Sequence, residues 1–123
     1  MHVWFIDDDD ITNMLNQYFI EEHFPNISIS IFAEAEDALI ELCQNKATPD
    51  FIFLDINMPV MNGWDFLDEL SKCASNRDSY PAVYILSSSV DPSDLKKAEE
   101  SIFVKGFISK PLEPEKVPFL KGE

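Results

Sequence analysis

This sequence has few basic residues, few cysteines and no long apolar run, and each of these features excludes some classes of protein. Nine basic residues stand against 23 acidic ones, and the formal net charge of −14 disfavours binding to nucleic acid or to an anionic membrane. Cys43 and Cys73 have neither CxxC spacing nor zinc-ligand neighbours, so we expect two reduced thiols in amphipathic helices. No apolar run is long enough to span a bilayer, and the N-terminus lacks the basic region of a signal peptide. We therefore expect a cytoplasmic protein.

The composition is that of one folded domain. The chain has 123 residues, which suits a single domain over 1–123. Its hydrophobic fraction is 46%, with ten Phe and two Trp, so it has enough apolar material for a core and does not resemble a disordered chain.

Short apolar runs alternate with segments of helical periodicity. The runs predict strands over 2–6, 27–32, 51–54, 82–86 and 106–109. The first helical segment should face the core with a stripe of apolar residues, namely Ile11, Met14, Leu15, Tyr18 and Phe19. A helix starting near Pro92 should carry Leu95, Ala98 and Ile102 on one face. The last helix, over 113–121, should be short or distorted because it contains Pro114 and Pro118.

Five such units predict an α/β fold of the (βα)₅ type. Strands that alternate with helices form a parallel sheet with helices on both faces, a doubly wound arrangement. For five strands we expect the flavodoxin-like order 2-1-3-4-5, which puts a ligand crevice beyond the carboxyl ends of the first and third strands.

Polar side chains stand where the predicted strands end. Asp7 to Asp10 follow the first strand, Asp55 the third, Ser87 to Ser89 the fourth, and Lys110 the fifth. We expect Asp7, Asp8, Asp55 and Lys110 to meet at one edge of the sheet. Asp9 and Asp10 fit a helix start instead, with Asp10 or Thr12 as the cap.

Clustered carboxylates call for a cation. Two carboxylates about 4 Å apart repel by roughly 4 kcal/mol at an effective dielectric of 20. Mg²⁺ suits such a site because it takes few carboxylates and keeps waters that phosphate oxygens can replace. An aspartate can also attack phosphorus, and Ser87 and Lys110 have the character needed to meet the charge of a transferring phosphoryl group.

The residues at these strand ends resemble the receiver domains of two-component response regulators, the CheY-like family. The resemblance is carried by Asp7-Asp8, the run from Asp55 to Gly63, Ser87 and Lys110-Pro111, in order and with suitable spacing. The run from Asp55 is the most specific part. The sequence departs from the family on the helix 4–strand 5–helix 5 face, where a usual Gly is absent near Ile102 and Pro118 interrupts the last helix.

The resemblance implies a role for each of these residues. Asp55 would be the phosphoacceptor. Mg²⁺ would be bound by Asp7, Asp8, Asp55 and the backbone carbonyl of Asn57, while Ser87 and Lys110 would contact the phosphoryl group. Phe107 stands at the aromatic switch position, although it fits plain core packing equally well. The peptide bond between Lys110 and Pro111 is often cis in the family, and the sequence does not decide it.

The implied function is a signalling switch rather than an enzyme. Its partners would be a sensor histidine kinase or a histidine phosphotransfer protein, with an unknown protein as target and neither nucleic acid nor membrane. A phosphatase of the haloacid dehalogenase type remains an alternative, with Asp7 and Asp9 as its acids. A receiver fold with an inactive site is another. The chain could stand alone or be part of a longer protein.

Overall fold

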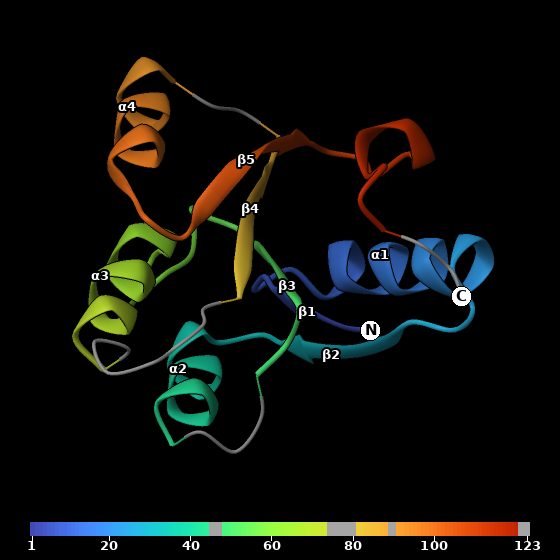
Figure 1. Ribbon diagram of the computed structural model, residues 1–123, viewed down its shortest axis with the longest axis horizontal. Helices are drawn as coiled ribbons and strands as arrows, with labels where there is room; N and C mark the ends of the chain where they lie inside the picture. The colour runs from blue at the N-terminus through green and yellow to red at the C-terminus, as the bar shows by residue number, and fades with distance from the viewer. Residues whose placement is uncertain (45–47, 74–80, 89–90, 121–123) are drawn as a thin grey trace.

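The computed structural model describes residues 1–44, 48–73, 81–88 and 91–120, and in them strands alternate with helices (Figure 1). The strands are β1 (His2–Ile6), β2 (Ser28–Phe32), β3 (Phe51–Leu54), β4 (Ala82–Ser87) and β5 (Val104–Ser109). The helices are α1 (Asp10–His23), α2 (Ala35–Cys43), α3 (Gly63–Cys73) and α4 (Pro92–Glu100), followed by a 3₁₀ turn, η1 (Pro114–Lys116). The predicted strands are present, and β5 begins two residues earlier than expected.

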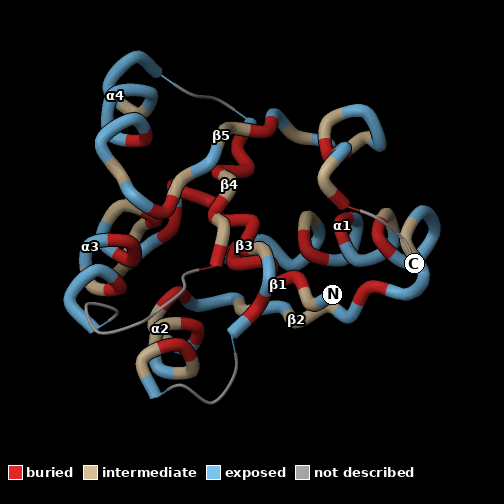
Figure 2. The backbone as a smooth tube through the Cα atoms, in the orientation of Figure 1, coloured by how far each residue is buried: buried red, intermediate tan, exposed pale blue. Residues whose placement is uncertain are grey.

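All strand pairs are parallel, in the order β2-β1-β3-β4-β5, which confirms the predicted topology. Alternate strand residues point to opposite faces of the sheet. Phe5 and Phe53 join a core cluster beneath α1 and the C-terminal segment, whereas Trp4 and Ile52 join a cluster beneath α2 and α3. Both faces are covered, and the buried residues concentrate along the central strands (Figure 2), which explains why β1 and β3 are apolar throughout.

Helix α1 turns a different face to the core from the one its apolar stripe predicted. Four of the five predicted residues are largely exposed: Ile11 by 64%, Met14 by 61%, Leu15 by 61% and Tyr18 by 56%. Phe19 is half-buried, and the buried positions are Asn13, Asn16 and Ile20.

Two contacts hold this face inward: Ile20 packs in the core cluster beneath α1, and a hydrogen bond fixes the start of the helix. The Asn13 amide Nδ2 donates to the backbone carbonyl of Asp7 at 2.8 Å, so Asn13 faces inward at the end of β1. The N-cap also differs from the prediction. It is Asp9, whose carboxylate accepts from the Ile11 amide and from the Thr12 hydroxyl.

The predictions for the last two helices hold in part. Helix α4 begins at Pro92 as expected, capped by Asp91, but it ends at Glu100. Ile102 therefore lies beyond the helix and is 67% exposed, while Ala98 is the one predicted residue of that face that is buried. The short final helix is confirmed, because only the η1 turn forms among the described residues of 113–120.

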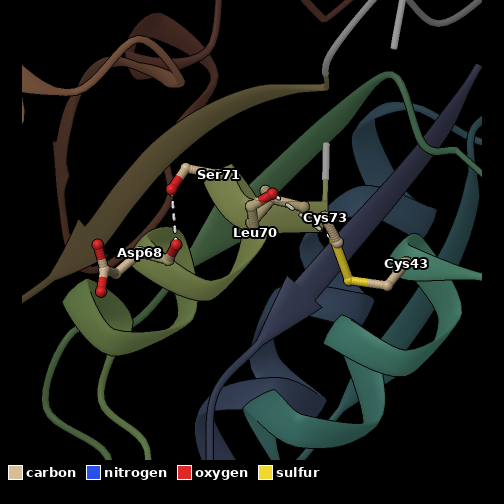
Figure 3. Close-up of a disulfide and its surroundings, with 5 residues drawn as sticks. All are labelled: Cys43, Asp68, Leu70, Ser71 and Cys73. Carbon is tan, nitrogen blue, oxygen red and sulfur yellow. Dashed lines mark hydrogen bonds between the residues drawn. A yellow bond between two sulfur atoms is a disulfide. The ribbon is translucent and has the colours of Figure 1, made fainter. Parts of the chain in front are cut away.

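The expectation of two reduced thiols is wrong. Cys43, the last residue of α2, and Cys73, the last residue of α3, form a disulfide with Cα atoms 5.6 Å apart (Figure 3). The two helices pack on the same face of the sheet, so their C-terminal ends meet although the cysteines are 30 residues apart in sequence. No helix in the described part of the chain is long and apolar enough to cross a membrane.

Candidate functional site

An acidic cluster lies at the carboxyl ends of the two central strands β1 and β3. Ile6 and Leu54 are paired in register, so the residues that follow them, Asp7 and Asp55, emerge side by side. The Asp55 amide donates to the Ile6 carbonyl at 2.9 Å, which fixes this relationship. Together with Asp8, these residues each offer a carboxylate oxygen, and the three oxygens lie within 4.8 Å of one another. The structure thus brings together the three acids that the sequence singled out.

Asp7 is held in place from several sides. Its side chain is nearly buried, and its Oδ2 lies 2.9 Å from Nζ of Lys110, which itself is 22% exposed. Its Oδ1 accepts from the Asp9 amide at 2.9 Å. Together with the Asn13 bond to its carbonyl, these contacts leave the Asp7 carboxylate rigid and partly neutralised.

Asp55 is buried with less compensation. It is 6% exposed, and its Oδ1 accepts from the Asn57 amide at 3.1 Å. Burial raises the pKa of the Asp55 carboxyl, and the negative charges of Asp7 and Asp8 raise it further, against the opposing effects of the Asn57 amide and of Lys110. A cation placed among the three acids would remove this repulsion.

Asp8 and Asn57 form the open side of the cluster, and both are exposed. An ion could reach the cluster from solvent on this side while keeping part of its hydration shell. Such a mixture of carboxylate, carbonyl and water oxygens is the donor set that Mg²⁺ prefers, so the residues present fit that ion.

The remaining predicted residues lie on β4, on β5 and just after β5. Ser87 is the last residue of β4 and is 2% exposed, and its carbonyl accepts from the Lys110 amide at 3.1 Å. Phe107 is half-buried on β5, opposite Ile85, and packs against the core cluster beneath α2 and α3. The peptide bond between Lys110 and Pro111 is cis. Ser88 is exposed, and Ser89 lies outside the described residues.

A tight turn carries the chain from Asp55 to α3. The Gly63 amide donates to the Ile56 carbonyl at 3.2 Å. A Cβ on Gly63 would lie 2.8 Å from the Ile56 Cα and 2.9 Å from the Asp55 carbonyl oxygen, closer than real Cβ contacts allow. Val60, in the middle of the turn, has φ of 67° and is 91% exposed. Glycine at position 63 therefore permits the close approach that positions Asp55.

Sequence reasoning missed two hydrogen bonds near the site, one to Asp7 itself and one between the helices α3 and α4. Asn13 supports Asp7, and its position on the first turn of the helix after the acidic run was the available signal. The Trp64 indole donates to Asp94 Oδ1 at 3.1 Å and so ties the start of α3 to α4. No sequence pattern pointed to that second contact.

Comparison with known proteins identifies this arrangement. The family model described as response regulator receiver domain matches residues 3–118. The chain belongs to the response regulator receiver family. As such it is a receiver domain of the kind used in two-component signalling.

Individual relatives agree with this assignment. The receiver is 37% identical to a two-component response regulator from Cytophaga hutchinsonii, with a TM-score of 0.79 over 96% of this chain and 91% of that one. Vibrio cholerae CheY4, at 23% identity and a TM-score of 0.73 over 96% of this chain and 92% of that one, shares the fold.

A curated relative is longer than this chain. The sensory transduction protein LytT of Enterococcus faecalis is 26% identical over 117 residues, which is 95% of this chain and 45% of that protein. The receiver therefore spans less than half the length of this curated relative.

Proposed function

We propose that this receiver is a phosphorylation switch in which Asp55 accepts a phosphoryl group from a phosphohistidine donor. An Asp55 carboxylate oxygen would form a bond to phosphorus while the bond from phosphorus to the histidine nitrogen breaks, and the imidazole leaves with its nitrogen free to take a proton. The observation that carries the proposal is the convergence of the Asp7, Asp8 and Asp55 oxygens within 4.8 Å, next to Lys110.

The same cluster would hold Mg²⁺. Asp7, Asp8, Asp55 and the backbone carbonyl of Asn57 are the proposed ligands. When bound, the ion would neutralise charge on the transferring phosphoryl group. Lys110, at 2.9 Å from Asp7, is close enough to the cluster to exchange that partner for a phosphoryl oxygen.

Ser87 and Phe107 would transmit the change. Ser87 is buried at the end of β4, adjacent to Lys110 through a backbone hydrogen bond. Phe107 borders a cleft on the surface between α4 and β5, with Leu95, Ala98 and Val104. A movement of Ser87 toward the phosphoryl group would open space into which the Phe107 ring can turn, and the α4–β5 surface would change for an unknown protein target.

The exposed stripe of α1 supports a protein donor. Ile11, Met14, Leu15 and Tyr18 form an apolar surface that begins four residues after Asp7. Exposed apolar surface on this scale marks contact sites for other proteins. A sensor histidine kinase or a histidine phosphotransfer protein that presents its histidine to Asp55 would contact this stripe. We propose that these encounters occur in the cytoplasm.

The phosphatase alternative fits the geometry less well. It needs Asp7 as the nucleophile and Asp9 as a second acid at the same site. The Asp9 carboxylate instead accepts from the Ile11 amide and the Thr12 hydroxyl, which also lower the pKa of Asp9. Asp9 is thus engaged as a helix cap, whereas Asp55 faces the cluster. An inactive receiver is also disfavoured, because each acidic ligand and Lys110 are present.

Labelling with a small phosphodonor tests the proposal. The full chain is incubated with Mg²⁺ and acetyl phosphate, and its intact mass is measured. We expect one phosphoryl adduct that hydroxylamine removes, absent from Asp55→Asn and retained in the exposed control Asp10→Asn. An adduct that survives in Asp55→Asn, or steady turnover of p-nitrophenyl phosphate, would overturn the assignment.

Thermal unfolding tests the metal site separately. A ligand that binds only the folded chain stabilises it by about 2.7 kcal/mol at a hundred times its Kd. We expect Mg²⁺ to raise the melting temperature of the parent and of Asp10→Ala, but not that of Asp8→Ala. Asp8 is exposed, so its removal leaves the core intact. An equal rise in all three proteins would argue against binding at this cluster.

A further inference from the structure

A disulfide lies away from the proposed phosphorylation chemistry. It joins Cys43 and Cys73, the last residues of α2 and α3, and Figure 3 shows the bond running between the two helix ends. Their Cα atoms are 5.6 Å apart, a separation that a disulfide bridges without movement of the backbone. The two helix ends are therefore placed so that the bond spans them without a change in their packing.

The two sulfur-bearing residues differ in exposure. Cys73 is exposed, whereas Cys43 is half-buried. Thiol–disulfide exchange requires a thiolate to reach one of the two sulfur atoms, and access is one of the factors that decide which sulfur is attacked. The greater exposure of Cys73 therefore favours attack on that residue, with Cys43 as the leaving group.

The bond also encloses the proposed phosphoacceptor in a covalent ring. The cysteines have a sequence separation of 30, and β3, Asp55 and α3 all lie between them. Because a cross-link restricts mainly the unfolded chain, the closed ring stabilises the folded arrangement of this segment.

Helix α3 links the disulfide to Asp55. Its C-terminal residue is Cys73, and its first residue, Gly63, is in close contact with Ile56, the residue after Asp55. One end of α3 is thus bonded to α2, and its other end packs against the residue that follows Asp55.

Disulfides in reducing compartments are usually catalytic or redox-sensing rather than structural. A redox role for this disulfide therefore depends on the cytoplasmic location given under the proposed function. We propose that Cys43 and Cys73 form a thiol–disulfide exchange site for a low-molecular-weight thiol of the glutathione class. In its oxidised state the pair holds α3 and the Asp55 segment in place.

The exchange balances in two steps. The thiolate of reduced glutathione bonds to Cys73 Sγ, the bond between the two cysteines breaks, and Cys43 leaves as a thiolate that takes a proton. A second glutathione thiolate then attacks the glutathione sulfur of the mixed disulfide, releasing Cys73 and oxidised glutathione. Oxidised glutathione reverses both steps, so it serves as the oxidant that re-forms the bond.

A redox titration tests the site. The full chain is equilibrated with graded ratios of reduced to oxidised glutathione, quenched in acid, and its free thiols are counted by alkylation and mass. We expect the pair to pass from oxidised to reduced within the titration, with the same curve from both directions. A bond that persists at every ratio would make it a structural staple, and a bond that never forms would remove the site. Either result overturns the proposal.

Single variants test which sulfur is attacked. With oxidised glutathione, Cys43→Ser should form a mixed disulfide at the exposed Cys73 severalfold faster than Cys73→Ser forms one at the half-buried Cys43. Equal rates, or the reverse order, would contradict the assigned direction of attack. The reduced parent protein provides the same comparison by timed alkylation if a variant does not fold.

Hydrogen exchange tests the coupling to Asp55. Reduction of the parent should speed amide exchange in residues 55–57 and 63–73, and leave the amides of α1 unchanged. Unaltered exchange in residues 55–57 would overturn the coupling. Acetyl phosphate labelling in both redox states keeps the two proposals apart. A chain that exchanges its disulfide but accepts no phosphoryl group in either state would refute only the phosphorylation switch.

Discussion

Lys110 Nζ lies 2.9 Å from Asp7 Oδ2, across 103 residues of sequence. The lysine pairs with Asp7 rather than with Asp55, so it compensates the more fully hydrogen-bonded of the two buried acids. Burial is the main cause of the raised pKa of Asp55, and the charges of Asp7 and Asp8 raise it further, whereas Lys110 lowers it. The Asp7 carboxylate is thus paired with Lys110, whereas burial disfavours the charged form of Asp55, and a bound cation or phosphoryl group would change this balance.

Lys110→Met should destabilise the folded chain. It leaves the nearly buried Asp7 carboxylate without its cation, which costs about 2 kcal/mol. Urea unfolding measures the loss, and Mg²⁺ should restore part of it by supplying positive charge. Lys72→Met is the matched control, because Lys72 pairs with Glu69 on the surface and should matter little. Equal stabilities for the two variants would show that the Lys110–Asp7 pair contributes nothing.

Asp55→Asn should stabilise the metal-free chain at neutral pH. The folded-state pKa of Asp55 is raised above its ordinary value of 3.8. Its contribution to stability is therefore complete below that value and is lost as the pH rises through the raised pKa. Unfolding curves from acid to neutral pH without Mg²⁺ should show the variant gaining on the parent as the pH rises. A constant difference between the two proteins would contradict the assigned cause.

The strands and the acidic cluster were predictable because they depend on local pattern plus a simple topology. A continuous apolar run such as 51–54 is typical of a strand in a sheet that is covered on both faces. Parallel strands bring their carboxyl ends to the same edge of the sheet. Asp7 and Asp55 could therefore be placed at one edge. The partner of Lys110 could not be predicted, because Asp7 and Asp55 both lie near its ammonium group. Only the side-chain geometry shows that the lysine pairs with Asp7.

The face of α1 and the disulfide depended on contacts between distant segments. Apolar periodicity favoured the stripe that contains Met14 and Leu15, yet the helix buries the face that carries Ile20 and Asn13, whose amide binds the Asp7 carbonyl. The pairing of Cys43 with Cys73 requires the C-terminal ends of α2 and α3 to be adjacent. The separation of 30 residues between the two cysteines does not indicate that these helix ends are adjacent.

Asn13→Ala should weaken Mg²⁺ binding as well as stability. The loss of a buried hydrogen bond costs about 1 kcal/mol, and Asp7 also loses the support of its backbone carbonyl. Calorimetric titration should therefore show a higher Mg²⁺ Kd. Asn16→Ala is the matched control on the same face, since the Asn16 side-chain nitrogen has no hydrogen-bond partner among the described residues. If both variants bind Mg²⁺ like the parent, Asn13 is merely structural.

Gly63→Ala should damage both stability and phosphorylation. The new methyl group would lie 2.8 Å from the Ile56 Cα and 2.9 Å from the Asp55 carbonyl oxygen, so the backbone next to Asp55 must shift. Overpacking of this kind costs about 1–3 kcal/mol, and acetyl phosphate should label the variant more slowly. Gly106→Ala is the matched control, because its nearest neighbours are Tyr84 ring atoms at 3.5 and 3.6 Å, an ordinary contact distance. Similar losses in the two variants would mean that the effect comes from glycine replacement in general and not from the contact with the Asp55 segment.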